Sequence, residues 1–190
     1  ENGKAEYFLE PTQVEIKDNH VLVDVLNEAY QDKGEITYSA IYGFTVTPKD
    51  GEPVGEVDWG KKAWWPFANS TKVGNKYEVQ SGEVIRFIYT QDNKVGFPGY
   101  VPPAGEGEQG SISVNKDKLI ANLGKITEKQ IEDNTEIYQS ALAVAIDFDA
   151  TQEAVNEQAE KIADILNQQV PATDITVSPK EVTLMVGETQ

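Results

Sequence analysis

The chain of 190 residues contains no cysteine, a single histidine and half as many basic as acidic side chains. Without cysteine it can form no disulfide, thiolate zinc site, iron–sulfur cluster or cysteine nucleophile. A Ser–His–Asp site would have to use His20, the one histidine. With 16 basic and 32 acidic residues the formal charge is −16, which repels phosphate backbones and anionic lipid surfaces. We therefore expect no nucleic-acid binding. We also expect no membrane insertion, because no apolar run approaches the roughly 18 residues needed to cross a bilayer.

The composition indicates a folded chain that divides into four stretches. Hydrophobic residues make up 39% and aromatic residues 9% of the chain, which argues against disorder. Residues 5–90 hold all three tryptophans, 91–114 are rich in glycine and proline, 115–168 favour helix, and 171–187 return to a strand pattern. Because the chain starts at Glu1 and ends within a strand pattern, we expect a piece of a longer protein.

The first stretch predicts a small α+β fold. Alternating apolar residues indicate one strand over residues 6–17 and another over 36–42. Between them, apolar residues at helical spacing predict a helix that begins near Val21. An aromatic strand over residues 61–68 and a further strand over 83–90 follow. We therefore expect a sheet with one helix packed across it.

The middle of the chain and the helical stretch have different compositions. Residues 92–114 contain five glycines and three prolines, which is typical of a linker or a long loop. The stretch that follows has no proline and predicts three helices, over 115–126, 135–146 and 151–168, with Thr151 as the N-cap of the third. These helices could pack against one another as a bundle or dock on the sheet, and the sequence leaves both arrangements open.

Three segments of the first stretch carry a family resemblance. Val14–Asp18 lead into the predicted helix, Trp64–Asn69 form the aromatic strand and its turn, and Tyr77–Val84 precede a strand that ends in Tyr89-Thr90. Through them, residues 5–91 resemble the transcobalamin-like β-grasp domain, a family of unknown function found repeatedly in secreted bacterial surface proteins. The distant relatives of that family include the C-terminal domain of transcobalamin. The resemblance implies a β-grasp fold for this stretch.

Two further resemblances concern the C-terminal half. Ala172–Thr189 look like the opening strands of a bacterial immunoglobulin-like domain of the invasin type (group 2), so we expect residues 171–190 to be the truncated start of such a domain. The helical stretch is weakly similar, through Tyr138 and the Ala141-Leu142 pair, to the small three-helix repeats of Gram-positive surface proteins. Together the resemblances imply an extracellular location at a cell surface, of the Gram-positive type.

The candidate metal and catalytic groups have simpler structural explanations. His20 stands beside Asp18 and Asn19 just before the predicted helix, where it suits a turn or a cap better than a metal site without a second histidine. Asp147 and Asp149 mimic the start of a calcium loop, but the glycine and the final acid of such a loop are absent. The sequence holds no phosphate-binding glycine loop, dinucleotide pattern or nucleophile elbow. We therefore expect no enzyme, no metal site and no cofactor.

The aromatic residues around one strand are the best candidates for binding. Adjacent Trp64 and Trp65 must point to opposite faces of a strand, and the family resemblance assigns Trp64 to the core. Trp65 then needs a cover from the same chain or from a ligand, because an exposed tryptophan is unfavourable in water. We predict a ligand-binding group of Trp65 with Trp59 and Tyr100, and with Asn69 at the turn after the strand. A flat or ring-bearing molecule such as a sugar or a corrinoid would suit these residues.

We expect a non-catalytic extracellular module for binding, adhesion or spacing in a multidomain bacterial surface protein. Its partner would be a host or surface protein, or a small ligand such as a glycan or a corrinoid. The alternative, implied by the transcobalamin resemblance, is a capture domain for cobalamin or a related corrinoid. In transcobalamin a separate helical barrel holds the ligand, and the helical residues 115–168 are too few for such a barrel. A hydrolase is a third option, for which no nucleophile–base pair is visible.

These alternatives differ in the surroundings that they predict for Trp65. A capture domain should leave Trp65 in an open concave face, whereas a spacer should bury it under residues 91–168. An enzyme should instead bring carboxylates together in a pocket, where their pKa values would be shifted.

Overall fold

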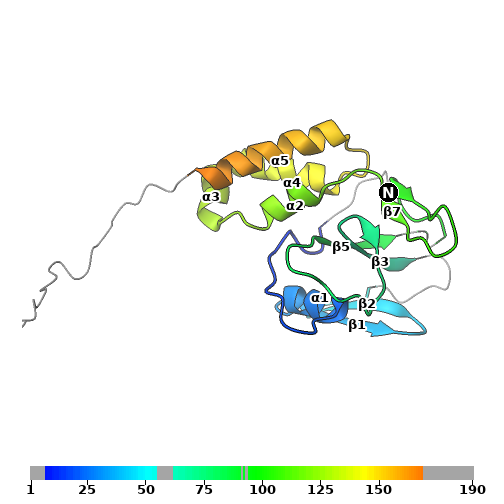
Figure 1. The fold of residues 1–190 in the computed structure, drawn as a ribbon. Helices are drawn as coiled ribbons and strands as arrows, with labels where there is room; N and C mark the ends of the chain where they lie inside the picture. Colours follow the sequence, from blue (N-terminus) through cyan, green and yellow to red (C-terminus); the bar gives the residue numbers. More distant parts are fainter. Residues whose placement is uncertain (1–6, 55–61, 91, 93, 169–190) are drawn as a thin grey trace, which may run out of the picture.

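The computed structural model describes residues 7–54, 62–90, 92 and 94–168, and it has an α+β fold (Figure 1). These residues form a two-stranded sheet, a five-stranded sheet and five helices. The first helix packs with the strands, and the other four gather into a separate group (Figure 1). We call the described residues between 8 and 113 the sheet unit and residues 114–168 the helical unit.

Helix α1 (Leu22–Tyr30) confirms the helix predicted near the start of the chain. Its buried side chains recur at helical spacing and pack on a two-stranded sheet of β1 (Gly34–Ser39) and β2 (Gly43–Pro48). Asn27 fastens the helix to this sheet. Its Oδ1 accepts the N–H of Ile36 at 2.8 Å, and its Nδ2 donates to the carbonyl of the same residue.

The strand predicted over residues 36–42 is wrong in its second half, where the chain turns. After β1 ends, the hydroxyl of Ser39 accepts the N–H groups of Ile41 at 3.1 Å and of Tyr42 at 3.4 Å. Gly43 follows with a φ of 72°, and β2 returns antiparallel to β1. The alternation of apolar residues continues through this turn, which is why the pattern did not reveal it.

The larger sheet is curled into a half-barrel with the strand order β5–β3–β4–β7–β6. Its central strand β3 (Ala63–Ala68) lies between β5 (Ile85–Thr90) and β4 (Thr71–Lys72), and both pairings are antiparallel. Asn69 and Ser70 form the turn from β3 to β4, with φ of 44° and 69°. The aromatic strand, its turn and the strand beside it are therefore confirmed.

The glycine- and proline-rich residues 92–114, predicted as a linker or a long loop, are mostly loop where the structure describes them, and they also complete the sheet. They contain β6 (Tyr100–Val101) and β7 (Ser111–Ile112), which pair with each other, and β7 also pairs with β4. The ring of Tyr100 crosses close over Gly110, where a Cβ would lie 2.0 Å from the tyrosine hydroxyl oxygen. Gly110 is therefore needed for the close approach of an aromatic ring.

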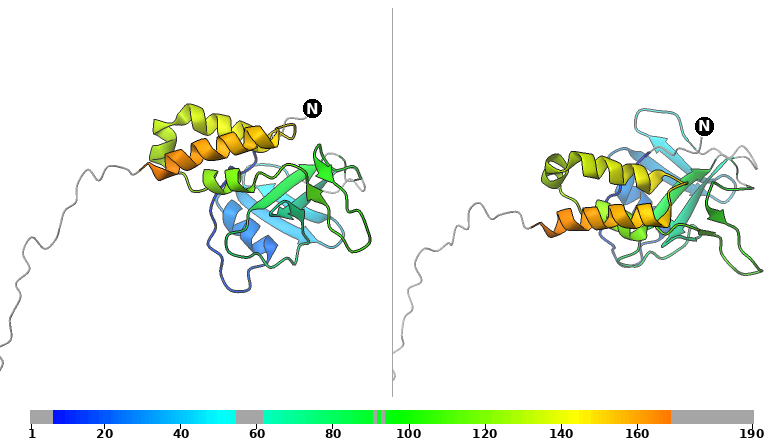
Figure 2. Two further views of the ribbon diagram at one scale, coloured as in Figure 1. Left: turned by 45° about the horizontal axis from the view of Figure 1, so that its top comes forward. Right: turned by 90° about the horizontal axis from the view of Figure 1, so that it is seen from above.

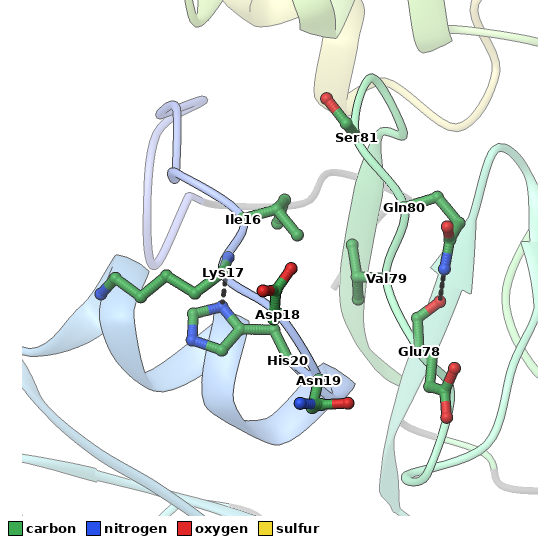
Figure 3. A pocket seen from close by; sticks show the side chains of 9 residues that line it. All are labelled: Ile16, Lys17, Asp18, Asn19, His20, Glu78, Val79, Gln80 and Ser81. Atoms are coloured by element: carbon green, nitrogen blue, oxygen red, sulfur yellow. Dashed lines mark hydrogen bonds between the residues drawn. The ribbon is translucent and has the colours of Figure 1, made fainter.

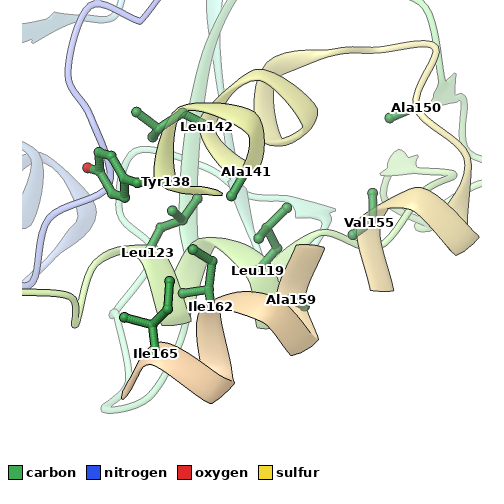
Figure 4. Packing of buried hydrophobic residues seen from close by; sticks show 10 residues of the cluster. All are labelled: Leu119, Leu123, Tyr138, Ala141, Leu142, Ala150, Val155, Ala159, Ile162 and Ile165. Atoms are coloured by element: carbon green, nitrogen blue, oxygen red, sulfur yellow. The ribbon is translucent and has the colours of Figure 1, made fainter. Parts of the chain in front are cut away.

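The helical unit contains α2 (Asp117–Leu123), α3 (Glu128–Asp133), α4 (Thr135–Ile146) and α5 (Gln152–Asn167). The three predicted helices are confirmed, and the short α3 is an addition. Helices α2, α4 and α5 pack against one another around a core of their own, so the bundle is formed and the sheet is not its main packing partner (Figure 4). The core consists of Leu119, Leu123, Tyr138, Ala141, Leu142, Ala150, Val155, Ala159, Ile162 and Ile165.

Residues 7–20 form no strand, so the first predicted strand is wrong for the part of it that the structure describes. This segment contacts both units. Tyr7 packs on the helical core and donates its hydroxyl to the carbonyl of Leu142 at 3.0 Å. The ring of Phe8 lies 5.2 Å from that of Trp64 in the sheet unit. Alternate side chains of an extended chain point in opposite directions, and here the two directions lead to two different cores.

The helical unit lies along one side of the sheet unit (Figure 2). In the described part of the chain, no helix has both the length and the apolar composition needed to cross a membrane. Residues 171–190, predicted as the start of an immunoglobulin-like domain, lie outside the described residues.

Candidate functional site

Strand β3 directs its two adjacent tryptophans to opposite faces, as predicted. Trp64, which is 8% exposed, stacks on Phe87 with ring centroids 4.7 Å apart, and its Nε1 donates to the carbonyl of Val54 at 3.0 Å. Trp65, which is 6% exposed, lies on the other face together with Phe67. Each tryptophan thus belongs to a different aromatic group of the sheet unit.

The glycine- and proline-rich stretch covers Trp65. The ring of Tyr100 lies edge-on to Trp65 with centroids 4.8 Å apart, and the ring of Phe97 lies 6.2 Å away. At Gly96 a Cβ would come within 2.9 Å of the indole, so the backbone itself packs on the ring. The cover comes from the same chain, which is the arrangement expected of a spacer and differs from the open concave face expected of a capture domain.

Lys72 adds a positive charge to this aromatic group. Its Nζ lies 3.2 Å from the centroid of the Trp65 ring and 5.8 Å from that of Tyr100, which are cation–π contacts. Burial lowers the pKa of Lys72 to about 8. Nothing in the sequence marked this lysine. The register of β3 and β4 sets it opposite Phe67 and therefore on the face of Trp65.

The structure brings together two of the four predicted ligand-binding residues. Trp65 and Tyr100 are in contact, and Trp59 lies outside the described residues. Asn69 is exposed at the turn between β3 and β4, where its Oδ1 accepts the N–H of Val84 at 3.0 Å. This bond ties the turn to the residue before β5, so Asn69 has a structural partner.

A largely buried ion pair connects the sheet unit to the helical unit. Nη2 of Arg86 on β5 lies 2.9 Å from Oδ1 of Asp117 in the first turn of α2, and the two side chains are 10% and 17% exposed. The hydroxyl of Ser70 contacts both partners. Burial lowers the pKa of Arg86, while Asp117 raises it. Nε of Arg86 is buried and has no hydrogen-bond partner among the described residues.

Lys116 is a second buried cation at this junction, and it is only 4% exposed. Its Nζ donates to the carbonyls of Val144 at 2.9 Å and Ala145 at 3.2 Å, and also to that of Asp147. These carbonyls belong to the C-terminal end of α4, where a positive charge is favourable. Burial and the nearby charge of Arg86 lower the pKa of Lys116 to about 8.

A cleft of about 1970 Å³ opens between the two units. All six residues of β5 line it, together with residues 7–16, parts of α2 and α4, and parts of α1, β1 and β2, so the space continues into the sheet unit. Most of its lining side chains are aliphatic or aromatic. Its described acidic and basic lining residues are equal in number, although the chain as a whole carries a charge of −16. These residues are Glu10, Glu15, Glu83, Arg86, Lys116 and Lys125.

A smaller, polar hollow of about 180 Å³ lies beside His20 (Figure 3). Asp18 and Glu78 lie on its two sides (Figure 3). Nδ1 of His20 accepts the N–H of Lys17 at 3.4 Å, and its Nε2 lies 3.9 Å from the carboxylate of Glu28. His20 therefore belongs to the turn before α1, as expected. Within the residues described, no group of three or more histidine, aspartate or glutamate side chains is placed to hold a metal ion.

The lysine and arginine side chains whose pKa is lowered serve the packing of the fold. Lys72 faces Trp65, Arg86 faces Asp117, and Lys116 faces helix carbonyls, so the three cations have separate structural partners. Comparisons of the chain with protein families, with curated proteins and with solved structures found no match. Its contacts are therefore the basis on which a function can be assigned.

Proposed function

We propose that this chain is a non-catalytic extracellular module of a multidomain bacterial surface protein, of the Gram-positive type, which binds a partner and spaces its neighbours. The proposal includes a β-grasp arrangement for the sheet unit, in which α1 lies across the sheet. The observation that carries the proposal is the wide, mainly apolar cleft between two units that are fastened to each other.

The fastening supports a role that needs a fixed shape. The pair of Arg86 and Asp117 joins β5 to α2, and residues Tyr7 and Phe8 pack on the two cores from one short segment. Such contacts hold the walls of the cleft at a set distance. A fixed cleft favours binding, because less conformational freedom is lost when a partner enters.

The chemistry of the cleft supports binding without catalysis. Of its three described cations, Lys125 is exposed, whereas Arg86 contacts Asp117, Lys116 contacts helix carbonyls, and both of these are largely buried. Groups engaged in this way hold structure together and are not poised to exchange protons with a substrate. Apolar walls with a few polar groups are typical of recognition sites.

A binding screen with two matched variants tests the proposal. The purified chain is immobilised, and host extracellular proteins, glycans and a cobalamin are passed over it in surface plasmon resonance. Ile88→Arg places a charge in the cleft, whereas Ile41→Arg makes the same change at the tip of the β1–β2 hairpin, where Ile41 is 61% exposed. We expect a ligand that binds the parent and Ile41→Arg equally, and Ile88→Arg at least about tenfold more weakly.

Two outcomes would contradict the proposal. Ligand binding that survives Ile88→Arg and is lost in Ile41→Arg would move the binding role to the hairpin. Turnover of an ester, peptide or glycoside by the purified chain, abolished by Ile88→Arg, would show that the cleft belongs to an enzyme. Circular dichroism of both variants checks that they remain folded.

Capture of a corrinoid is the second candidate, and the size of the cleft favours it. The cover over Trp65 argues against stacking of a corrinoid on that ring, so the ligand would have to enter the cleft between the units. Equilibrium dialysis against a cobalamin separates the candidates. Retention that is lost in Ile88→Arg and kept in Trp65→Ala would favour a corrinoid held in the cleft.

A further inference from the structure

Strand β5 has one paired edge and one outer edge. The carbonyl of Val84 accepts the N–H of Asn69 at 3.0 Å, which fixes the phase of the β3–β5 ladder. Backbone groups alternate in direction along an antiparallel strand, so every second residue from Val84 onward points at β3. Ile85, Phe87 and Tyr89 therefore direct their N–H and C=O groups away from β3.

The other side of β3 gives the same phase. The carbonyl of Pro66 accepts the N–H of Val73 at 3.0 Å, so the backbone of Pro66 faces the side of β4. Pro66 stands opposite Phe87 in the register, and this pair is thus not hydrogen-bonded. Within the described ranges, no residue forms a backbone hydrogen bond with the outer groups of Ile85, Phe87 or Tyr89.

This outer edge runs along the cleft. All of β5 lines the cleft, and so do residues 12–16, which are not in strand conformation. An unpaired strand edge is a template for another strand, because its donors and acceptors are spaced for a second backbone. A row of three residues with outward N–H and C=O groups in an apolar cleft therefore fits an extended polypeptide.

The size and the lining of the cleft agree with such an occupant. Pockets for small molecules usually measure roughly 300–1000 Å³, and this cleft is larger, at about 1970 Å³. A six-residue strand that matches the length of β5 is about 20 Å long. On the two sides of the edge lie the aromatic rings of Phe87 and Tyr89 and the side chain of Ile88. The balanced charges of the lining favour an uncharged partner.

We propose that the outer edge of β5 binds an extended, uncharged peptide segment of a protein partner, which adds a sixth strand to the half-barrel sheet. This inference rests on the proposed binding role and names the class of partner. A second copy of the chain is a poor occupant, because residues 7–16 and the helical unit of each copy line the same cleft as β5 and would have to approach those of the other copy. A single strand can enter where two such walls would collide.

Amide exchange measured by NMR tests the proposal residue by residue. The probe is a capped hexapeptide of alternating threonine and valine, N-methylated on every second residue so that it keeps one hydrogen-bonding edge and does not aggregate. The control peptide is methylated on every residue. The peptide is added at about 1 mM, a concentration at which weak binding is still measurable. We expect slower exchange for the amides of Ile85, Phe87 and Tyr89 with the probe and no change with the control.

Two variants at one position separate the backbone from the side chain. Ile85→Pro removes an outward N–H at the first residue of the strand, where proline is tolerated. Ile85→Ala removes most of the same side chain and keeps the N–H. We expect Ile85→Pro to bind the probe about fivefold more weakly than Ile85→Ala.

Several results would overturn the inference. The first is that the three amides are already protected in the free protein, which would mean that the chain fills its own edge. The second is that the probe causes no change at any of the three, or binds elsewhere. The third is protection that depends on protein concentration and not on the probe, which would indicate a second copy. If a cobalamin or a glycan binds in the cleft while the probe does not, the peptide inference fails and the proposed binding role stands.

Discussion

The guanidinium of Arg86 on β5 lies 2.9 Å from the carboxylate of Asp117 on α2, and this pair joins the two units of the chain. The residues are 31 positions apart in the sequence, and the segment between them contains β6 and β7. The ion pair thus fixes the helical unit to the strand that lines the cleft. Its position explains how a chain with two separate cores can present one wide cleft of set width.

We predict that Asp117→Ala lowers the free energy of unfolding by about 3 kcal/mol, because it leaves the buried charge of Arg86 without its partner. Asp133→Ala is the matched control: Asp133 is 4.0 Å from Lys129 and largely exposed, so its loss should change stability by less than about 0.5 kcal/mol. Urea denaturation gives both values. Equal effects of the two changes would show that the Arg86 pair does not hold the units together.

Replacing both partners of the pair should be much less harmful than replacing one. In Arg86→Met with Asp117→Leu, no buried charge is left unpaired, so we expect most of the stability lost in Asp117→Ala to return. Urea denaturation of the double variant measures this. A double variant that is less stable than Asp117→Ala would mean that the geometry of the ion pair, and not the burial of charge, is what matters here.

Lys72 should make the stability depend on pH. Its pKa is about 8 in the folded chain, below the usual lysine value of 10.5. At pH values between these two pKa values, Lys72 keeps its proton in the unfolded chain and has released it in the folded chain. The free energy of unfolding should therefore rise with pH from about 8 towards 10. Lys72→Met should flatten part of this rise, while Lys116, with a similar pKa, supplies the rest in both proteins. Urea titrations over this range measure the two slopes, and identical slopes would refute the assignment.

Two different substitutions should expose Trp65 to solvent. Tyr100→Ala deletes the edge-on ring, and Gly110→Ala pushes it away, since the new Cβ would lie 2.0 Å from its hydroxyl oxygen. We expect both variants to increase the quenching of tryptophan fluorescence by acrylamide. Tyr42→Ala, at the exposed hairpin tip, should leave quenching unchanged. If Tyr100→Ala behaves like Tyr42→Ala, other parts of the chain shield the indole.

Asn27 should contribute to stability through its backbone partner. Asn27→Ala leaves the N–H and C=O of the buried residue Ile36 without the amide that serves both. We predict a loss of about 2 kcal/mol. Gln31→Ala, an exposed position just after the same helix, should have an effect close to zero. Thermal unfolding compares the two variants. If Asn27→Ala loses no more stability than Gln31→Ala, this role of Asn27 is contradicted.

Local patterns in the sequence predicted much of the secondary structure. The spacing of apolar residues in α1 and the N-cap of α5, where Thr151 accepts the N–H of Ala154 at 3.2 Å, are local features that neighbouring residues determine. The opposite directions of Trp64 and Trp65 follow from strand geometry alone. Such features need no knowledge of the rest of the fold.

Long-range contacts explain what the sequence did not reveal. The apolar alternation near Tyr7 belongs to two cores that lie on either side of the segment, so it resembles a strand without forming one. Residues 92–114 become part of the sheet because the rings of Tyr100 and Phe97 pack against Trp65. The contact between Lys72 and Trp65 was not predictable, since it depends on the register of β3 and β4.

The most direct test of the fixed cleft is a distance across it, and the absence of cysteine makes the labelling simple. Thr37 is exposed on β1 of the sheet unit and Glu160 is exposed on α5 of the helical unit, so Thr37→Cys with Glu160→Cys places one spin label on each unit. Double electron–electron resonance should give a single narrow distance distribution, which broadens when Asp117→Ala is added. A broad distribution before that change would show that the two units move freely and that the cleft has no set shape.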